Sequence, residues 1–437
     1  SELSIQSQLQ GMALNLPAPL NKRSDEMVAF KYDNTIVNTV NNKAQRDQIQ
    51  LNWGRALSAA YLRDVSQAEP RILNGRWAVG DAPHSTNTSL AESGVLAVFN
   101  LPAFSVDDWL QVFSPAKSSP TYNATQNLGI GQSAQNYLPT RMNLKAGELA
   151  IQGRALHNVT VSGSRDGLLW RSNLDAKEFS GYLEYRQSTP QNAGRIYARL
   201  ARLSLPPSAE QTVESLLEDS PVAIPALDIV VEDLELRGKK MGRVEIEAIN
   251  TDPTLPRSST GREWRLQKLN ITLPEASFKA TGKWMTAKEG GQAMTDMAFK
   301  LDISDSGELL NRLGTKDALR GGGGKLEGQV SWQGSPLSLH YPSLGGRFNV
   351  NIGRGQFLQA EPGVAKLLGV LSLQALPRRL LLDFRDVFSA GFAFDTIRGD
   401  VSIQQGIAST RNLQMKGVNA VVQMEGSSDI AKETQNL

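Results

Sequence analysis

One pattern of alternating residues occurs twice in this chain, and it constrains the fold more than any other feature. Residues 149–161 read LAIQGRALHNVTV, and residues 234–246, which begin 85 positions later, read LELRGKKMGRVEI. The apolar or glycine positions that the two copies share are Leu149, Ile151, Gly153, Leu156, Val159 and Val161 in the first and Leu234, Leu236, Gly238, Met241, Val244 and Ile246 in the second. The polar residues between them differ, which is typical of strands with one dry and one wet face. Each copy therefore predicts a β-hairpin.

Short alternating segments continue through the rest of the chain, at residues 269–273, 299–303, 348–352, 392–394, 401–403 and 413–415. Three short helical patterns follow start signals at Ser105, Ser208 and Ser306, which are 103 and 98 residues apart. The first two have the spacing of a capping box. The hairpins and the helices together predict a repeated unit of several strands and one short helix.

The predicted fold is mainly β: a repeating β-groove, in which an open, twisted antiparallel sheet forms a half-pipe, with a few short helices. We expect groove repeats with a short helix at residues 1–114, 115–217 and 218–320, and a final β region at 321–437 with a helix at 361–376. Tandem sandwiches of similar length are the alternative. The open array is favoured because a few short helices cannot cover roughly 20 half-dry strands, so that the dry face is left for a ligand.

Composition excludes several classes of function. The chain has 437 residues, of which 40% are hydrophobic, so it should hold more than one domain or a repeat array. Its 46 Lys and Arg against 44 Asp and Glu leave a formal charge of +2, which gives no overall attraction to nucleic acid. The absence of cysteine rules out disulfides and thiolate metal sites and is compatible with either the cytosol or a bacterial envelope.

No apolar run approaches the roughly 20 residues of a membrane helix, so any anchor is expected outside this sequence. The longest apolar stretch, GVAKLLGVLSLQAL at 363–376, is followed by Pro377, Arg378 and Arg379. It predicts a helix that either packs on the sheet, caps the groove or lies on a membrane surface with the two arginines toward phosphate.

Signals for catalysis are weak. His84, His157 and His340 lack metal-ligand spacing, and Lys325 after the glycines at 321–324 is followed by leucine rather than the Ser or Thr of a phosphate loop. Three acidic pairs (Asp107 with Asp108, Glu232 with Asp233, Asp383 with Asp386) have plainer roles at helix starts, before strands or beside arginine. We therefore predict no catalytic residue, metal or cofactor, with glycan processing as an alternative, because carboxylate pairs are recognised by their separation in space.

The last quarter of the chain is the most specific stretch. It contains Leu-Gly-Val-Leu-Ser-Leu at 368–373, Leu-Pro-Arg-Arg at 376–379, Asp383-Phe384, Gly-Phe-Ala-Phe-Asp at 391–395 and alternating strands over 399–426. This combination resembles the C-terminal region of AsmA-like envelope proteins of Gram-negative bacteria. The preceding residues resemble the same family more loosely, through their strand rhythm and the repeated hairpin pattern.

The resemblance implies a periplasmic part of an inner-membrane-anchored rod, built of β-groove units with a continuous apolar groove. Such proteins are implicated in moving phospholipid toward the outer membrane, so the implied partners are phospholipid and the two membranes, reached through regions outside this segment. The resemblance implies that the family's N-terminal membrane helix and its extreme C-terminal end lie outside this sequence. A structural or adhesive β-rod without lipid is the alternative function.

Under the groove interpretation, the inward apolar side chains of the strands line the lipid path, and the alternative is ordinary core between two sheets. The predicted lining residues are Leu149, Ile151, Val159, Val161, Leu234, Leu236, Val244, Ile246, Ile271, Leu273, Phe392 and Phe394. Arg378 and Arg379 are the predicted headgroup or membrane contacts.

Overall fold

A computed structural model shows a chain made almost entirely of β-strands. It describes residues 2–37, 45–81, 93–113, 137–151, 153–189, 193–205, 224–251, 263–285, 293–336, 339–358, 393–417, 421–430, 432 and 434–436. The chain divides into two compact units, Ser1–Arg186 and Gln187–Leu437. We refer to them as the N-terminal unit and the C-terminal unit and describe each by itself.

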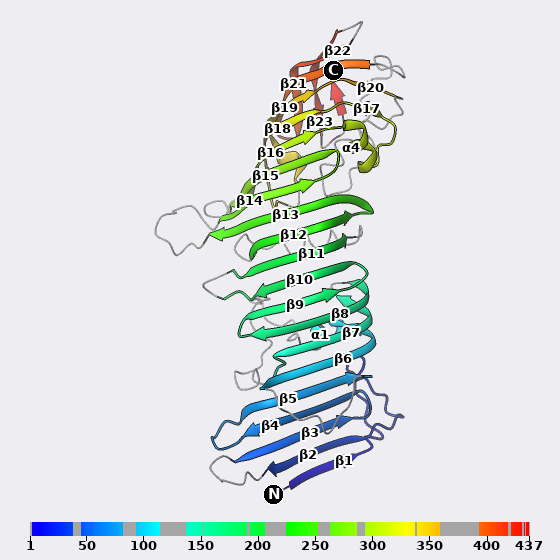
Figure 1. Cartoon of the computed structure of the whole chain (residues 1–437), viewed down its shortest axis with the longest axis vertical. Coiled ribbons are helices and arrows are strands. Elements are labelled where there is room, and N and C mark those ends of the chain that lie inside the picture. The colour runs from blue at the N-terminus through cyan, green and yellow to red at the C-terminus, as the bar shows by residue number, and fades with distance from the viewer. Residues whose placement is uncertain are drawn as a thin grey trace. The chain divides into compact units, whose positions relative to one another are not determined.

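The N-terminal unit is a sheet whose strands pair in chain order from β1 to β10 (Figure 1). Its elements are β1 (Glu2–Ser7), β2 (Phe30–Val37), β3 (Arg46–Trp53), β4 (Leu57–Asp64), β5 (Arg71–Gly80), β6 (Gly94–Ser105), α1 (Val106–Phe113), β7 (Arg141–Ile151), β8 (Arg154–Asp166), β9 (Leu169–Asp175) and β10 (Phe179–Arg186). The helix α1 is therefore inserted between two neighbouring strands, β6 and β7.

The C-terminal unit is a second run of paired strands in the order β11 to β16, then β18, β19 and β21 to β24, while β17 and β20 pair beside β21. Its first elements are β11 (Arg195–Leu205), β12 (Ala226–Leu236), β13 (Lys239–Thr251), β14 (Glu263–Thr272), β15 (Ala276–Met285), β16 (Met294–Ile303), α4 (Ser306–Leu313) and β17 (Leu319–Gly321). The remainder are β18 (Gly324–Gln333), the 3₁₀ turn η2 (Tyr341–Ser343), β19 (Gly345–Ile352), β20 (Gly355–Phe357), β21 (Ala393–Gln404), β22 (Ile407–Gly417), β23 (Val421–Asp429) and β24 (Thr434–Asn436).

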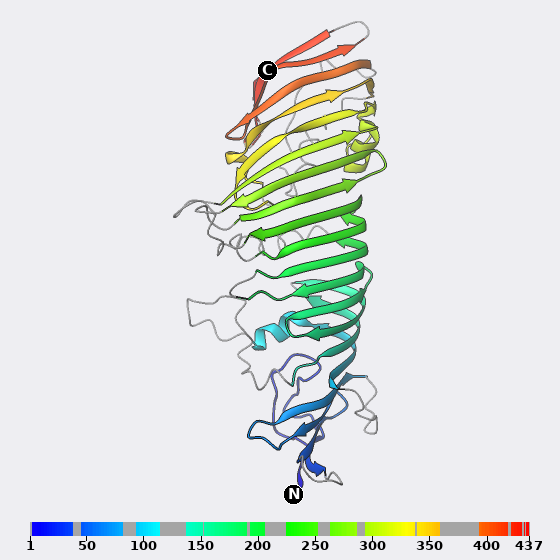
Figure 2. The same cartoon turned by 60° about the vertical axis from the view of Figure 1, so that its left-hand side comes forward.

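The predicted fold class, an open and mainly β sheet with short helices, is confirmed. Figure 2 shows how successive strands of each unit turn gradually, as the right-handed twist of β-sheets requires. The prediction of antiparallel pairing holds for most neighbours, but β5 with β6, β6 with β7, and β11 with β12 are parallel. A parallel pair needs a connection that returns along the length of the strand, and such a return leaves no trace in residue alternation.

Both copies of the repeated pattern form the predicted hairpins. In the first, β7 and β8 pair so that Ala146 lies opposite Val159; in the second, β12 and β13 pair so that Val231 lies opposite Val244. The second copy turns through Arg237 and Gly238, whose φ angles are 54° and 73°. Two positive φ angles in a row are typical of the tight turns that match strand twist, and they explain why each copy keeps a glycine there.

Two of the predicted helices lie in the described part of the chain. The Ser105 side chain accepts a hydrogen bond from the Asp108 amide of α1 at 3.1 Å, as its capping pattern predicts. The helix α4 starts at Ser306 as predicted, although its cap is the Asp305 side chain, which accepts from the Glu308 amide. The helical patterns after Ser208 and at 361–376 lie outside the described residues, and the four predicted repeat boundaries stay predictions. No described helix has the length and apolar character to cross a membrane.

Candidate functional site

The sheet of the C-terminal unit has one apolar face. Residues directly opposite each other on antiparallel strands share a face, so the strand register defines rows that run across the sheet. One row crosses β12 to β16, β18, β19 and β21 as Ile229, Ile246, Leu269, Ala280, Phe299, Gly328, Phe348 and Val401. A second row beside it reads Val231, Val244, Ile271, Phe278, Leu301, Leu326, Val350 and Gly399. The apolar character is thus unbroken over eight consecutive strands.

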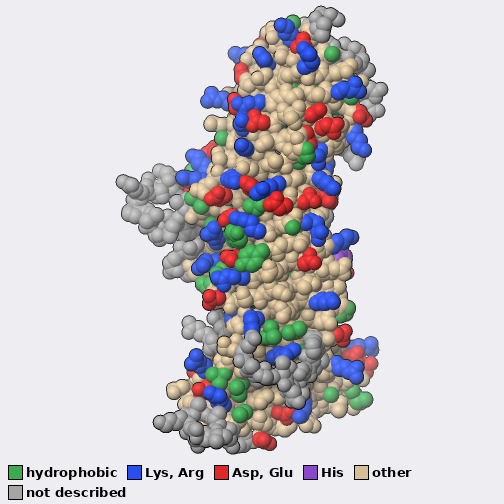
Figure 3. Space-filling model, in the orientation of Figure 1, with side chains coloured by type: hydrophobic (Ala, Val, Ile, Leu, Met, Phe, Trp, Pro, Cys, Tyr) green, Lys and Arg blue, Asp and Glu red, His purple; other side chains and the backbone are tan. Residues whose placement is uncertain are grey.

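The opposite face of the same strands is polar. The row between the two apolar ones reads Val230, Glu245, Asn270, Lys279, Lys300, Glu327, Asn349 and Asp400. Ion pairs join neighbours on this face, such as Lys300 with Asp302 at 2.7 Å, and the hydrogen bond from Lys268 holds the pKa of Glu245 below its usual value. Figure 3 shows one face of each unit with Lys, Arg, Asp and Glu side chains spread over its strands. The polar face therefore needs no cover.

The apolar face of the C-terminal unit is half-buried along its middle and buried at its margins. Most side chains of the first row, among them Ile246, Phe299 and Phe348, are only half-buried. At one end of the strands lies a buried cluster of Leu319, Ile352, Phe394 and Met415, against which Leu310 of α4 packs. At the other end lie two clusters made of Ile224, Ala248, Trp264 and Trp284, and of Trp332, Leu344, Ile403 and Ile430. Within the described residues, the central strip is not packed against a second sheet.

An aromatic series runs along the middle of this strip. Phe278 and Phe299 stack with their ring centres 6.3 Å apart, and Phe299 and Phe348 are 6.4 Å apart. Gly328 lies between the last two rings, and it has no room for a side chain because a Cβ there would lie 2.3 Å from the Arg347 carbonyl oxygen. At Gly328 no side chain therefore rises above the backbone between the rings of Phe299 and Phe348.

The apolar face of the N-terminal unit is more fully buried around the first copy of the pattern. A cluster there consists of Leu144, Ala146, Leu149, Val159, Val161 and Ala176. Val159 is 0% exposed, and Val106 of α1 packs against the cluster. Thus α1 lies over the part of the sheet that the first hairpin forms.

The structure brings together some of the predicted lining residues and separates others. Leu149, Val159 and Val161 meet in the N-terminal cluster, Val244, Ile246 and Ile271 belong to the two apolar rows, and Phe394 lies in the cluster beside α4. Ile151, Leu234, Leu236 and Leu273 are half-buried near hairpin turns. Phe392, Arg378 and Arg379 lie outside the described residues. Their role as lining or headgroup contacts stays a prediction.

A polar cluster on the apolar side of the N-terminal unit was missed by sequence reasoning. Arg63 forms two hydrogen bonds with the Asp47 carboxylate, at 2.9 and 2.5 Å, and a third with the Tyr137 hydroxyl at 2.9 Å. The Tyr61 hydroxyl donates to the Tyr137 carbonyl oxygen at 2.9 Å and accepts from the Trp77 indole. Its burial raises the pKa of Tyr61 to about 12, while the Asp47 carboxylate raises the pKa of Arg63. The cluster fixes the end of the connection from β6 to β7 onto β4.

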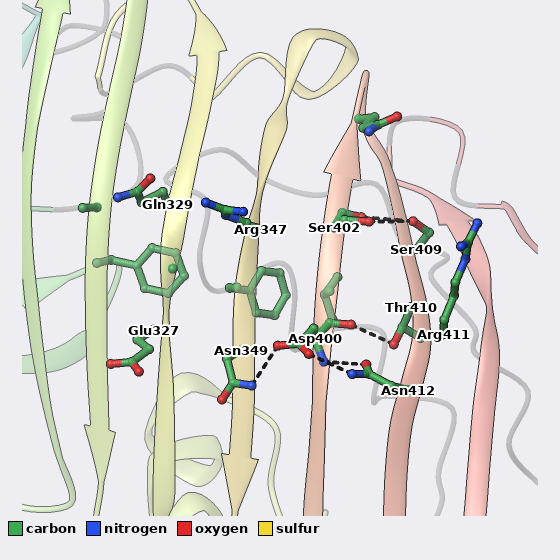
Figure 4. A pocket seen from close by; sticks show the side chains of 16 residues that line it. Glu327, Gln329, Arg347, Asn349, Asp400, Ser402, Ser409, Thr410, Arg411 and Asn412 are labelled. Atoms are coloured by element: carbon green, nitrogen blue, oxygen red, sulfur yellow. Dashed lines mark hydrogen bonds between the residues drawn. The ribbon is translucent and has the colours of Figure 1, made fainter.

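A depression of about 980 Å³ opens on the polar face of the C-terminal unit, against β18, β19, β21 and β22 (Figure 4). A register shift between Arg398 and Ser402 interrupts the pairing of β21 with β22 beside Asp400, which keeps its partner Asn349 on β19. The Asp400 carboxylate accepts from the Asn349 and Asn412 amides at 2.9 and 2.8 Å, and these bonds lower its pKa. Ser402 and Ser409 bond to each other at 2.9 Å. The polar groups in this depression thus largely satisfy one another and hold the irregular strands together.

The weaker candidates from the sequence have structural partners. Asp107 accepts a hydrogen bond from the Gly153 amide at 2.8 Å, Glu232 pairs with Arg243, and His157 bonds to Glu178 at 2.7 Å. His84 and the pair Asp383 and Asp386 lie outside the described residues. Among the residues that are described, no group of acidic or histidine side chains is arranged to hold a metal ion.

Comparison with known proteins adds independent evidence. A family model described as YhdP protein matches residues 1–437. One curated relative, the intermembrane phospholipid transporter YhdP of Escherichia coli (strain K12), is 23% identical over 456 residues. The match covers 100% of this chain and 32% of the relative, so the chain spans about a third of that protein's length. No solved structure matches the chain. The resemblance seen in the last quarter of the sequence is confirmed over its whole length.

Proposed function

This chain belongs to the YhdP protein family, and from that premise we propose that it forms part of a bridge along which phospholipids pass between two membranes. The acyl chains would lie on the apolar face of each sheet while the headgroups stay in water. No residue is catalytic in this mechanism, because the chain supplies a surface and not a reaction. The curated relative carries the name of an intermembrane phospholipid transporter.

The observation that carries the proposal is the half-buried apolar strip of the C-terminal unit. Its central row crosses eight strands without a charged residue. At a strand spacing of about 4.8 Å, the row is about 34 Å long. An acyl chain spans half of a hydrocarbon core of about 30 Å, so the row is long enough for two chains end to end.

The energetics favour such a surface. Dragging an acyl tail of about 16 carbons into water costs about 0.8 kcal/mol per methylene, or roughly 13 kcal/mol. Contact with a continuous apolar strip removes most of this cost at every position along the row. Because the same apolar cross-section recurs from strand to strand, a lipid can move sideways without meeting a large barrier. Net movement then follows from the supply and removal of lipid at the two ends.

The two membranes would be the inner and outer membranes of a Gram-negative envelope, and the chain would lie in the periplasm between them. The buried clusters at both ends of the strands support this use of the sheet, because they bound the strip on both sides. With both margins of the strip filled by these clusters, a lipid headgroup would reach water on the side that points away from the sheet. A β-rod without lipid, the alternative function, would leave the half-buried strip of Ile246, Phe299 and Phe348 in contact with water.

The test compares two adjacent residues of one strand. Phe299 points to the apolar face and Ala298 to the polar face of β16. After incubation with phosphatidylethanolamine vesicles, native mass spectrometry and lipid extraction should find phospholipid on the purified parent chain. Phe299→Asp should reduce bound lipid about tenfold, because it places a charge against the acyl chain.

Ala298→Asp is the matched control, since it adds the same charge to the same strand on the other face. It should leave lipid content unchanged. The proposal fails if the parent chain binds no phospholipid, or if both variants lose lipid equally while their circular dichroism spectra match that of the parent.

A further inference from the structure

The depression on the polar face of the C-terminal unit has a feature that the apolar strip on the other face does not explain. Two arginines that line it, Arg347 on β19 and Arg411 on β22, have no hydrogen bond or ion pair within the described residues. We propose that this depression binds a phosphate ester of a small polyol, with the two arginines holding the phosphate. The site is independent of the proposed function, because the acyl chains would lie on the opposite face of the sheet.

Most described arginines of this unit have an acidic or amide partner. Arg243 pairs with Glu245 at 2.8 Å, and the Arg398 guanidinium donates to the side-chain oxygen of Asn351 at 3.0 Å. A guanidinium carries five N–H donors in a planar fork that matches the oxygens of a phosphate. Two such groups without partners beside one depression therefore point to an anionic ligand.

The two carboxylates in the depression are already engaged. The Asp400 carboxylate accepts from the side-chain amides of Asn349 and Asn412, and Glu327 forms an ion pair with Lys325. Together with Lys325, the two lining arginines give three cations against two carboxylates. The depression thus has a net positive charge, which attracts an anion and disfavours a cation.

The two arginines lie on either side of a pair of hydroxyls. Arg347 is directly opposite Ser402, and Ser402 is directly opposite Ser409, so that these residues form one row across β19, β21 and β22. Figure 4 shows this row, with Arg411 on the far side of Ser409. The strands β19 and β22 are two strand spacings apart, about 10 Å. Long side chains from both strands can converge over this distance on one phosphate above the serines.

The rest of the lining matches the hydroxyl groups of a polyol. Gln329 lies opposite Arg347 on β18, and Gln404 and Thr410 also line the depression. Amide and hydroxyl side chains both donate and accept hydrogen bonds, as the hydroxyls of glycerol or a sugar do. The volume of about 980 Å³ is in the range of small-molecule sites, but those sites are mostly lined by apolar side chains. A polar lining of this size therefore calls for a ligand that is polar throughout.

The irregular pairing of β21 and β22 shapes the site without help from a ligand. The register shifts between Arg398 and Ser402, and side chains join the two strands there. The Asp400 amide donates to the side-chain oxygen of Asn412 at 2.9 Å, and the Thr410 hydroxyl donates to the Asp400 carbonyl oxygen at 2.8 Å. Because neither lining arginine takes part in these bonds, each can be replaced without loss of the local fold.

Calorimetric titration of the purified chain with sn-glycerol 3-phosphate tests the site. The parent should bind it saturably. Arg347→Gln and Arg411→Gln should each weaken binding about tenfold, since each removes charge-assisted hydrogen bonds to the phosphate. Glycerol alone should not bind measurably. No saturable binding by the parent, or equal binding of glycerol and its phosphate, would overturn the proposal.

Arg398→Gln is the matched control. Arg398 lies on the same strand and the same face as Asp400, and it is bonded to Asn351 outside the depression. Its replacement removes the same charge from the same face and should leave the affinity within about twofold. Equal weakening by Arg398→Gln and Arg347→Gln would mean a general attraction of phosphate to this face and would overturn the site.

A second arm distinguishes a soluble ligand from a membrane surface, because vesicles of phosphatidylglycerol present the same phosphate ester. Cosedimentation with vesicles that Arg347→Gln reduces and glycerol phosphate competes away would support the site and assign its ligand to lipid headgroups. Binding of glycerol phosphate without such cosedimentation would support the site and assign a soluble ester. Phe299→Asp, on the other face, should reduce bound acyl lipid and leave glycerol phosphate binding unchanged. Failure of this site and failure of the transport function are therefore separate results.

Discussion

The two copies of the hairpin pattern share their local structure and differ in how deeply their side chains are buried. Both turn at a glycine with φ near +70°, and both bury the valine in the middle of the second strand, Val159 at 0% and Val244 at 3% exposed. Away from this centre they diverge: Leu149 and Val161 are buried, whereas Leu234 and Ile246 are half-buried. The same alternating sequence is thus buried in one unit and half-buried in the other.

The connections that lead into the two hairpins differ in the same way. The connection before β7 ends at Tyr137, which is held by a buried ion pair between Arg63 and Asp47. The connection before β12 ends at Ile224, which packs with Trp264 and other apolar side chains. Both endings lie on the apolar side of their sheets. The second ending is also hydrogen-bonded, because the Asn250 amide donates to the Ile224 carbonyl oxygen at 2.8 Å.

The largest expected effect comes from the buried ion pair. Asp47→Ala leaves Arg63, whose side chain is 15% exposed, without its carboxylate, and an unpaired charge in such a place costs about 3–5 kcal/mol. Glu275→Ala in the C-terminal unit should cost about 1–2 kcal/mol, because its partner Arg312 is 27% exposed and can turn to water. Urea unfolding of both variants measures the difference, and equal losses would contradict the expectation that the exposure of the remaining arginine sets the cost.

The next effect contrasts a charge in the buried and in the half-buried copy. Val161→Asp should destabilise the N-terminal unit by about 3 kcal/mol, because the carboxylate has neither water nor a partner there. Ile246→Asp should cost only about 1 kcal/mol, since its side chain reaches water, and should mainly reduce lipid binding. Amide hydrogen exchange of β8 and β13 measures the loss of stability in each hairpin. Comparable loss of protection in the two hairpins would show that Ile246 is core.

A smaller effect should be the same in both copies. Gly153 and Gly238 have φ angles of 70° and 73°, and a Cβ at either would meet nothing within 4 Å. Alanine at either position should therefore cost about 1 kcal/mol through backbone strain alone. Thermal unfolding of Gly153→Ala and Gly238→Ala should show equal shifts. Unequal shifts would mean that the turns, and not the burial of the strands, distinguish the two hairpins.

The smallest expected effect is the pH dependence of stability that Asp400 on the polar face contributes. Hydrogen bonds from Asn349 and Asn412 lower the pKa of Asp400 in the folded chain. A carboxylate with a lowered folded pKa stabilises above its unfolded pKa of about 3.9, and this contribution is lost as the pH falls through the folded value. Asp400→Asn should therefore melt below the parent at pH 7, and this difference should shrink as the pH falls through the folded pKa of Asp400. A gap that persists in acid would contradict this assignment.

Sequence reasoning found the features that depend on near neighbours. Strand alternation, the two hairpins and the starts of α1 and α4 follow from residues within a few positions of one another. It also placed Val244, Ile246 and Ile271 on one face, because alternation fixes which side chains share a side. The last quarter of the sequence carried the family resemblance, although Phe392, Arg378 and Arg379 lie outside the described residues.

Residue alternation alone implies that these strands have one dry and one wet face, because side chains alternate across a strand with a period of two. How deeply each dry face is buried depends on contacts between segments that are far apart in the chain. The parallel pairs, the seat of α1 and the contact of Tyr137 with Arg63, 74 residues away, depend on where the chain returns after a connection. No local pattern encodes that return, because it is set by the balance of contacts between distant segments.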